Sequence, residues 1–184
     1  MRKEFDNMIV IGGSHRQSGK TDVACHIIKK LMKSGPVICL KVCCHDINDS
    51  RDTKADFMLD DYWMVKEEPQ EGTKSTDKMY AAGARAVYRL IVMRETLEEG
   101  FNLFLEAIGD KQMVVCESNS IIDIIKPASF IFISKQSEEK EKNSSSRVRK
   151  FADIIVENDG EKFKPALDKI KLPDIKGNIK KKNA

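Results

Sequence analysis

The sequence contains no long apolar run, no excess of charge of one sign and no pattern of paired cysteines. Its longest apolar runs, such as residues 8–11 and 130–133, are far shorter than the roughly 20 residues that cross a bilayer, and the opening residues MRKEFDN lack the apolar stretch of a signal peptide. The 32 basic and 29 acidic residues leave a net charge of +3, so no basic stripe points to a nucleic-acid binder. We therefore expect a cytoplasmic protein that binds neither membranes nor nucleic acid.

The five cysteines, an odd number, argue against a disulfide framework. A chain of 184 residues that is 41% hydrophobic is long enough to bury one core without crosslinks, so we expect reduced thiols. Cys43, Cys44 and His45 adjoin one another, but adjacent cysteines lack the usual zinc-site spacing and no second pair follows. Buried or incidental thiols are the favoured interpretation.

Short apolar runs alternate with segments of helical period along most of the chain. Apolar and β-branched runs predict strands at residues 7–12, 37–44, 86–93, 112–117, 129–134 and 152–157. Apolar residues three and four apart predict helices at residues 19–33, 76–84 and 95–109, and a short helix at 121–126. Strands that are apolar on both faces and alternate with helices predict an α/β fold, with a mostly parallel sheet and helices on both faces.

Three segments lack a clear period. Residues 45–75 predict a loop, and the polar residues 136–146 predict a solvated loop or the exposed start of a helix. Beyond Asp159 the chain becomes rich in lysine. We expect residues 1–160 to form one domain and residues 161–184 to form a frayed basic tail.

The most informative stretch runs from residue 9 to residue 21, IVIGGSHRQSGKT, because Gly-Lys-Thr stands where a buried strand gives way to a helix. This is the context of a Walker A phosphate loop. Backbone N–H groups and the helix N-terminus bind the α- and β-phosphates, Lys20 reaches the β- and γ-oxygens, and the Thr21 hydroxyl binds Mg²⁺. We therefore predict a three-layer P-loop NTPase fold. The predicted nucleotide-binding residues are Gly13, Ser14, Gln17, Ser18, Gly19, Lys20, Thr21 and Asp22.

The loop departs from the standard pattern at one position. Ser14 occupies the place of the first glycine, and glycines stand one and two residues earlier, at Gly13 and Gly12. Either Ser14 substitutes for that glycine or the loop is one residue longer. The competing interpretation is an ordinary glycine-rich turn in which Lys20 is a solvated residue at the helix start. No G-x-G-x-x-G occurs, which disfavours a dinucleotide site.

Carboxylates follow two predicted strands, at the sheet edge where ligands of open parallel sheets collect. We predict that Thr21, Asp46 and Glu117 bind Mg²⁺, although Asp46 alternatively caps a turn. Glu117 follows four apolar residues. It is the predicted catalytic residue, together with Lys20, because a carboxylate beside the γ-phosphate holds a metal or positions water.

Two other polar groups have alternative explanations. Asn119 and Ser120 either reach a substrate or cap a helix, and the segment 157–160 either reads a base edge or forms a simple turn.

The order of these features resembles the molybdopterin-guanine dinucleotide biosynthesis protein B family, small P-loop proteins of the SIMIBI class. The resemblance rests on the Gly-Lys-Thr loop, Lys41 with His45-Asp46, the segment 74–84 (KSTDKMYAAGA) and the glutamate that ends the fourth strand. That family usually has Lys-Asp-Ser before the Ala-Gly-Ala run and Glu-Gly after the fourth strand. Here these positions read Lys74-Ser75-Thr76 and Glu117-Ser118.

The resemblance implies a Mg²⁺-dependent protein that binds a nucleoside triphosphate, GTP or ATP, and hydrolyses it slowly. It further implies a homodimer that assists attachment of a nucleotide to molybdopterin, with a protein partner in cofactor biosynthesis. The sequence does not separate guanine from adenine, since the guanine-reading Asn-Lys-x-Asp is absent.

Two function classes stay open. The first is a nucleotide-dependent adaptor or slow NTPase, which the sparse set of polar motifs favours. The second is a small-molecule kinase or ligase of the dethiobiotin-synthetase type, which needs a dedicated acceptor pocket with a general base.

Overall fold

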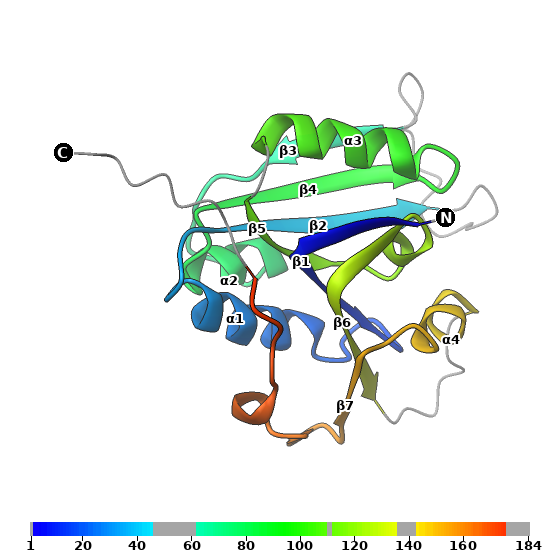
Figure 1. The fold of residues 1–184 in the computed structure, drawn as a ribbon. Helices are drawn as coiled ribbons and strands as arrows, with labels where there is room; N and C mark the ends of the chain where they lie inside the picture. The colour runs from blue at the N-terminus through cyan, green and yellow to red at the C-terminus, as the bar shows by residue number, and fades with distance from the viewer. Residues whose placement is uncertain (1, 46–61, 110–111, 136–142, 176–184) are drawn as a thin grey trace.

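The computed structural model describes residues 2–45, 62–109, 112–135 and 143–175. Within them, eight strands form one sheet in the order β3-β4-β2-β5-β1-β6-β7-β8 (Figure 1). The strands are β1 (Lys3–Gly13), β2 (Val37–His45), β3 (Tyr62–Lys66), β4 (Ala86–Met93), β5 (Met113–Glu117), β6 (Ile125–Lys135), β7 (Ile154–Asn158) and β8 (Phe163–Lys164). The helices are α1 (Lys20–Leu31), α2 (Ser75–Ala81), α3 (Leu97–Ile108) and α4 (Asn143–Arg149), with 3₁₀ turns η1 (Ser120–Asp123) and η2 (Leu167–Lys169).

The sheet is mostly parallel, as the sequence predicts. Strands β1, β2, β4, β5, β6 and β7 run in one direction, and β3 and β8 pair antiparallel at the two edges. Because parallel neighbours need crossover connections, the helices lie between the strands in sequence and against the sheet in space.

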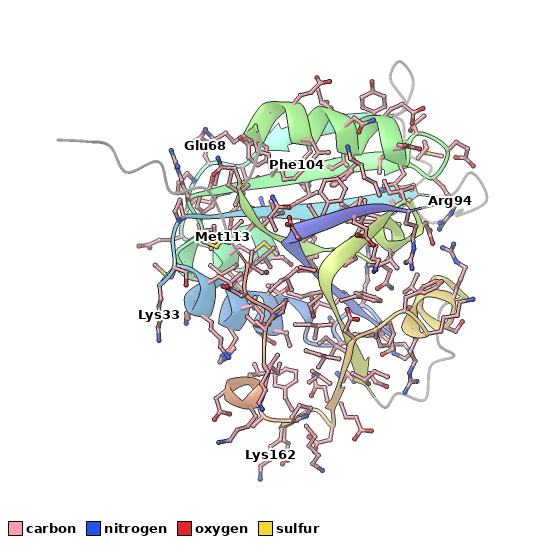
Figure 2. The ribbon with its side chains drawn as sticks, viewed as in Figure 1. Lys33, Glu68, Arg94, Phe104, Met113 and Lys162 are labelled. Atoms are coloured by element: carbon pink, nitrogen blue, oxygen red, sulfur yellow. The ribbon has the colours of Figure 1, made fainter. Side chains whose placement is uncertain are left out.

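Helices cover both faces of the sheet because its strands are apolar on both sides. In β1, Ile9 and Ile11 join the core with α1 and α2, whereas Met8 and Val10 join the core with α3, η1 and α4. Phe104 lies between α3 and the sheet, and Lys33 extends outward beyond the end of α1 (Figure 2). Among the described residues, no helix is long and apolar enough to span a membrane.

The structure differs from the sequence prediction in the segment 45–75, which contains β3. Tyr62 and Met64 pack against the core beneath α3, while Trp63 is exposed on the other face. This alternation is that of a half-buried edge strand, but it lasts only five residues and is easily missed.

The predicted short helix at 121–126 is also replaced in part by strand. η1 ends at Asp123, and β6 begins at Ile125 and runs through Pro127. Pro127 is tolerated because β6 pairs with β7 only from Ile131 onward, so the missing N–H leaves no broken pair on that side.

The segment 163–175, predicted as part of a frayed basic tail, packs into the core on the face of the sheet that α1 covers. Ile170 and Ile175 are buried there, and Nζ of Lys30 donates to the Ile170 carbonyl at 2.7 Å. Lysines separate the apolar residues of this segment, so its overall composition reads as basic although several of its residues are apolar. Residues 176–184 lie outside the described part of the chain.

We expect Ile170→Ala to lower the free energy of unfolding by about 2–4 kcal/mol, because removing this almost fully buried side chain leaves a cavity in the core. Lys171→Ala, at the exposed neighbouring position, is the matched control. Chemical denaturation measures both. Equal stability of the two variants would show that this segment does not pack on the core.

Candidate functional site

The strand connections diverge at the carboxyl ends of β1 and β5. The chain leaves β1 toward the face covered by α1, and it leaves the neighbouring β5 toward the opposite face, where Ile121 and Ile122 of η1 are buried. Open parallel sheets bind ligands at such a switch point, because the two departing chains leave a crevice between them. The residues that follow β1 and β5 are therefore the first candidates for a site.

The loop between β1 and α1 is tightly wrapped. A Cβ atom added to Gly13 would lie 2.4 Å from Oγ of Ser18, and Gly19 has a φ of 95°. Both positions therefore require glycine. Nζ of Lys20 folds back over the loop, where it lies 2.5 Å from the His15 carbonyl oxygen and 3.2 Å from Oγ of Ser18.

The remaining predicted loop residues differ in their surroundings. Ser14 is buried, and its backbone N–H and its side-chain oxygen bond to Ile133 and Lys135 of β6. Ser14 therefore ties the start of the loop to β6. Gln17 and Asp22 are exposed, so their side chains do not contribute to the packed base of the loop.

Two side chains brace the loop at Gly13. Asn119 accepts from the Gly13 N–H at 2.8 Å and donates to the Gly13 carbonyl at 3.0 Å. Ser145 of α4 is fully buried and donates to the carbonyls of Gly13 and Ser14. Asn119, predicted as a substrate contact or cap, thus holds the loop entrance, and Ser118 supplies the side-chain oxygen that accepts the Ile121 N–H of η1.

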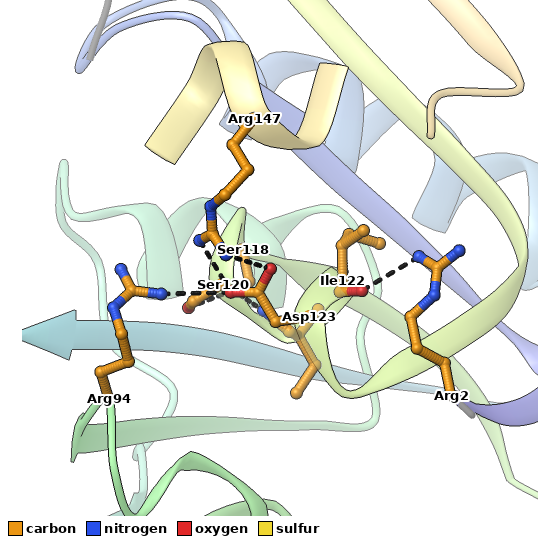
Figure 3. Close-up of polar contacts among 8 residues, drawn as sticks. Arg2, Arg94, Ser118, Ser120, Ile122, Asp123 and Arg147 are labelled. Carbon is orange, nitrogen blue, oxygen red and sulfur yellow. Dashed lines mark hydrogen bonds and ion pairs between the residues drawn. The ribbon is translucent and has the colours of Figure 1, made fainter. Parts of the chain in front are cut away.

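Sequence reasoning missed Ser145, because a small hydroxyl in a polar segment carries no distinguishing pattern. The helix that presents it is anchored through Asp123 (Figure 3). Arg147 of α4 contacts both carboxylate oxygens of Asp123, at 2.7 and 2.8 Å, and Arg94 contacts one of them at 3.1 Å. This bidentate pair fixes α4 against η1 and so positions Ser145.

Asn158 braces the far end of the loop by donating to the Ser18 carbonyl at 2.9 Å. Its Oδ1 accepts from the Gly160 N–H, and Asp159 accepts from the N–H groups of Glu161 and Lys162. These are the contacts of a turn, the simpler of the two predicted interpretations of residues 157–160.

Beside the loop, four polar side chains from four elements form a closed cluster, which we call the Glu117 ring. Oγ1 of Thr21 lies 2.9 Å from Oε2 of Glu117 and 3.1 Å from Oγ of Ser75. Nζ of Lys41 lies 2.7 Å from Oγ of Ser75 and 3.4 Å from Oε1 of Glu117. The ring thus joins the first turn of α1, the start of α2 and the strands β2 and β5.

Hydrogen bonds connect all four members of the ring. If Thr21 donates to Glu117, Ser75 donates to Thr21 and the Lys41 ammonium donates to both Ser75 and Glu117, then each hydroxyl donates once and accepts once. The sheet register places Lys41 directly opposite Glu117 on the neighbouring strand. The sequence predicted Thr21 and Glu117 as site residues but not Lys41 and Ser75, although a single lysine within the apolar run of β2 was the available signal.

The donor set suits a hard divalent cation better than a transition metal. Thr21 and Glu117 present oxygen ligands beside the loop, which are the ligands that Mg²⁺ prefers. Asp46, the third predicted ligand, lies outside the described residues. Within the described part of the chain, no group of three or more His, Cys, Asp or Glu side chains could hold a metal.

Three cysteines of β2 and β5 lie in surroundings that disfavour the reactive thiolate. Burial raises the pKa of the Cys43 thiol, and it also raises the pKa values of the fully buried Cys39 and Cys116. A raised pKa disfavours the thiolate, which is the nucleophilic form of cysteine.

A hollow of about 230 Å³ lies at the amino-terminal ends of β2 and β4, away from the loop, and is lined by Arg85, Tyr88 and Gln112 among others. Its described lining contains no carboxylate, histidine, serine, threonine or cysteine. Because it lacks the carboxylates and the serine and threonine hydroxyls that surround the loop, the loop and the Glu117 ring form the stronger candidate.

The chain gave no match to a protein-family model, to a curated protein or to a solved structure. The relation to the molybdopterin-guanine dinucleotide biosynthesis protein B family therefore stays a prediction. What bears on function is the arrangement of the loop after β1 and of the Glu117 ring beside it.

We expect Asn119→Ala to lower the free energy of unfolding by about 1–3 kcal/mol, because it leaves the buried N–H of Gly13 without an acceptor. Hydrogen exchange of the Gly13 amide should accelerate at the same time. Asn102→Ala, at an exposed position of α3, is the matched control and should change stability by less than about 0.5 kcal/mol. An unchanged exchange rate at Gly13 would contradict the bracing role.

Proposed function

We propose that this protein is a Mg²⁺-dependent nucleoside-triphosphate-binding protein that hydrolyses GTP or ATP slowly. We further propose that it acts as an adaptor in molybdenum cofactor biosynthesis or a related pathway. One observation carries the proposal: a glycine-bounded loop at the start of α1 holds the Lys20 ammonium over its own backbone, beside a Thr21–Glu117 pair.

The phosphates would bind in the loop between β1 and α1. The N-terminus of α1 carries partial positive charge and unsatisfied N–H groups, both of which favour an anion. Lys20 would exchange the His15 carbonyl for β- and γ-phosphate oxygens, a stronger charge-assisted contact. Asn119, Ser145 and Asn158 keep the loop in shape by bonding its backbone at Gly13 and Ser18.

Thr21 and Glu117 would hold the magnesium ion, directly or through water. When bound, Mg²⁺ supplies positive charge to the β- and γ-phosphate oxygens. Glu117 would also accept a hydrogen bond from the attacking water, since its carboxylate is the one charged group that β5 delivers to this edge.

The adaptor role is supported by how little chemistry surrounds the loop. Asn119, Ser145 and Asn158 hold the loop backbone, and Lys41 and Ser75 complete the Glu117 ring, so these polar groups already have structural roles. Such a site can bind and slowly hydrolyse a nucleotide, while a protein partner, or a second copy of the chain, reads the bound state.

The alternative, a small-molecule kinase of the dethiobiotin-synthetase type, is favoured by one feature. Arg89 on β4 lies opposite Lys41 in the sheet register, and the side chains of both are partly exposed. Arg89 and Lys41 thus stand side by side on neighbouring strands, next to Glu117, where they would bind an anionic acceptor. Arg89 is also paired with Glu67, at 2.5 Å, which reduces its availability.

We expect Lys20→Ala to abolish detectable binding of Mg·ATP and Mg·GTP while leaving the circular dichroism spectrum unchanged, because the ammonium lies over the loop backbone and not in the apolar core. Calorimetric titration with both nucleotides measures the loss and the base preference together. Lys29→Ala, at an exposed position of the same helix, is the matched control. Binding by Lys20→Ala as tight as that of the parent would overturn the phosphate-loop assignment.

We expect Glu117→Gln to slow hydrolysis at saturating Mg²⁺ and nucleotide at least about tenfold, a larger factor than the accompanying loss of nucleotide affinity, because the carboxylate acts on the attacking water as well as on the metal. Glu157→Gln, at an exposed position of β7, is the control. The γ-phosphate should appear as inorganic phosphate. If Glu117→Gln turns over at the parental rate, Glu117 is structural. If the γ-phosphate is transferred to an added small metabolite, the kinase alternative is favoured.

A further inference from the structure

We propose that Lys41 is a built-in counter-ion, which neutralises Glu117 in the metal-free protein and must be displaced when a divalent cation binds. Lys41 would thereby make metal binding depend on nucleotide. This inference rests on the proposed function, since it assigns the regulation of the same site.

The position of the ammonium supports a competition for the same oxygens. Nζ of Lys41 contacts Glu117 directly and reaches Thr21 through Ser75, whose hydroxyl lies 2.7 Å from Nζ and 3.1 Å from Oγ1 of Thr21. The two oxygens expected to ligate the metal are therefore already held in the hydrogen-bond network of a cation.

Burial makes this counter-ion necessary. The Glu117 side chain is only 8% exposed, and an unpaired carboxylate at such a position is strongly destabilising. Other nearby cations are already engaged: Lys20 contacts the His15 carbonyl and Arg89 pairs with Glu67. Lys41 is held opposite Glu117 by the pairing of β2 with β5, so its charge is part of the fold.

The charges at this site determine how metal and nucleotide influence each other's binding. A divalent ion that shares Glu117 with Lys41 meets a like charge a few ångströms away, which weakens its binding. A bound triphosphate adds several negative charges beside Glu117, so the Lys41 ammonium and the divalent ion then each have an anionic partner. Metal and nucleotide should therefore bind cooperatively, and each should raise the affinity for the other by the same factor.

Mn²⁺ alone is a suitable probe, because the electron paramagnetic resonance signal of the free ion disappears when it binds. We expect Lys41→Met to bind Mn²⁺ about tenfold more tightly than the parent in the absence of nucleotide, because one like charge has been removed. Lys41→Arg retains the charge and should stay near the parental affinity. Lys126→Met, which breaks an exposed ion pair with Glu4, is the matched control and should also match the parent.

Lys41→Gln is the second uncharged variant, in case Lys41→Met does not fold. It keeps an N–H donor for Ser75, and the same increase in Mn²⁺ affinity is expected. The double variant Lys41→Met with Glu117→Gln should lose the gain, because the carboxylate that binds the ion is gone. Parental Mn²⁺ affinity in a folded uncharged variant would overturn the proposal and leave Lys41 as a purely structural partner of Glu117.

Calorimetric titration of the parent with Mg·ATP and Mg·GTP separates this inference from the proposed function. If neither nucleotide binds while an uncharged variant gains Mn²⁺ affinity, the proposed function fails and the counter-ion role stands. If a nucleotide binds while Mn²⁺ affinity is the same in all Lys41 variants, the function stands and the counter-ion role fails.

Discussion

The buried negative charge of Glu117 is the constraint around which this edge of the sheet is organised. A carboxylate at the end of an apolar strand is stable only if it is paired and fully hydrogen-bonded. The fold meets this demand with Lys41 from the neighbouring strand and with hydroxyls from the first turns of α1 and α2. Neutralising one charge thus ties two helices and two strands together, and it places Thr21 where an incoming cation would need it.

The loop after β1 depends on the same region for its shape. Asn119 follows Glu117 by two residues and forms hydrogen bonds with the Gly13 backbone. Ser145 of α4 and Asn158 at the end of β7 donate hydrogen bonds to carbonyls of the loop. These braces use backbone carbonyls and one N–H of the loop entrance. A rigid scaffold of this kind leaves the Lys20 ammonium as the group that has to move when an anion arrives.

Local patterns carried much of the fold and part of the site. The β-branched run at Ala86–Met93 predicted β4 with its observed bounds, and Gly-Lys-Thr at a strand-to-helix junction located the loop. Contacts between distant segments left no local signal. The partnership of Lys41 with Glu117 depends on the order of the strands, and Ser145 gains its role only because Asp123 and Arg147 hold α4 in place. Ile170 was hidden by the lysines around it.

Backbone amide chemical shifts, recorded while a non-hydrolysable ATP or GTP analogue is added with Mg²⁺, test the central claim most directly. We expect shifts confined to residues 14–21 and to the neighbours Ser75 and Glu117, since the phosphates and the metal would contact these groups. Shifts at Arg85 and Gln112 with residues 14–21 unchanged, or no shifts with either analogue, would contradict a nucleotide site at the start of α1.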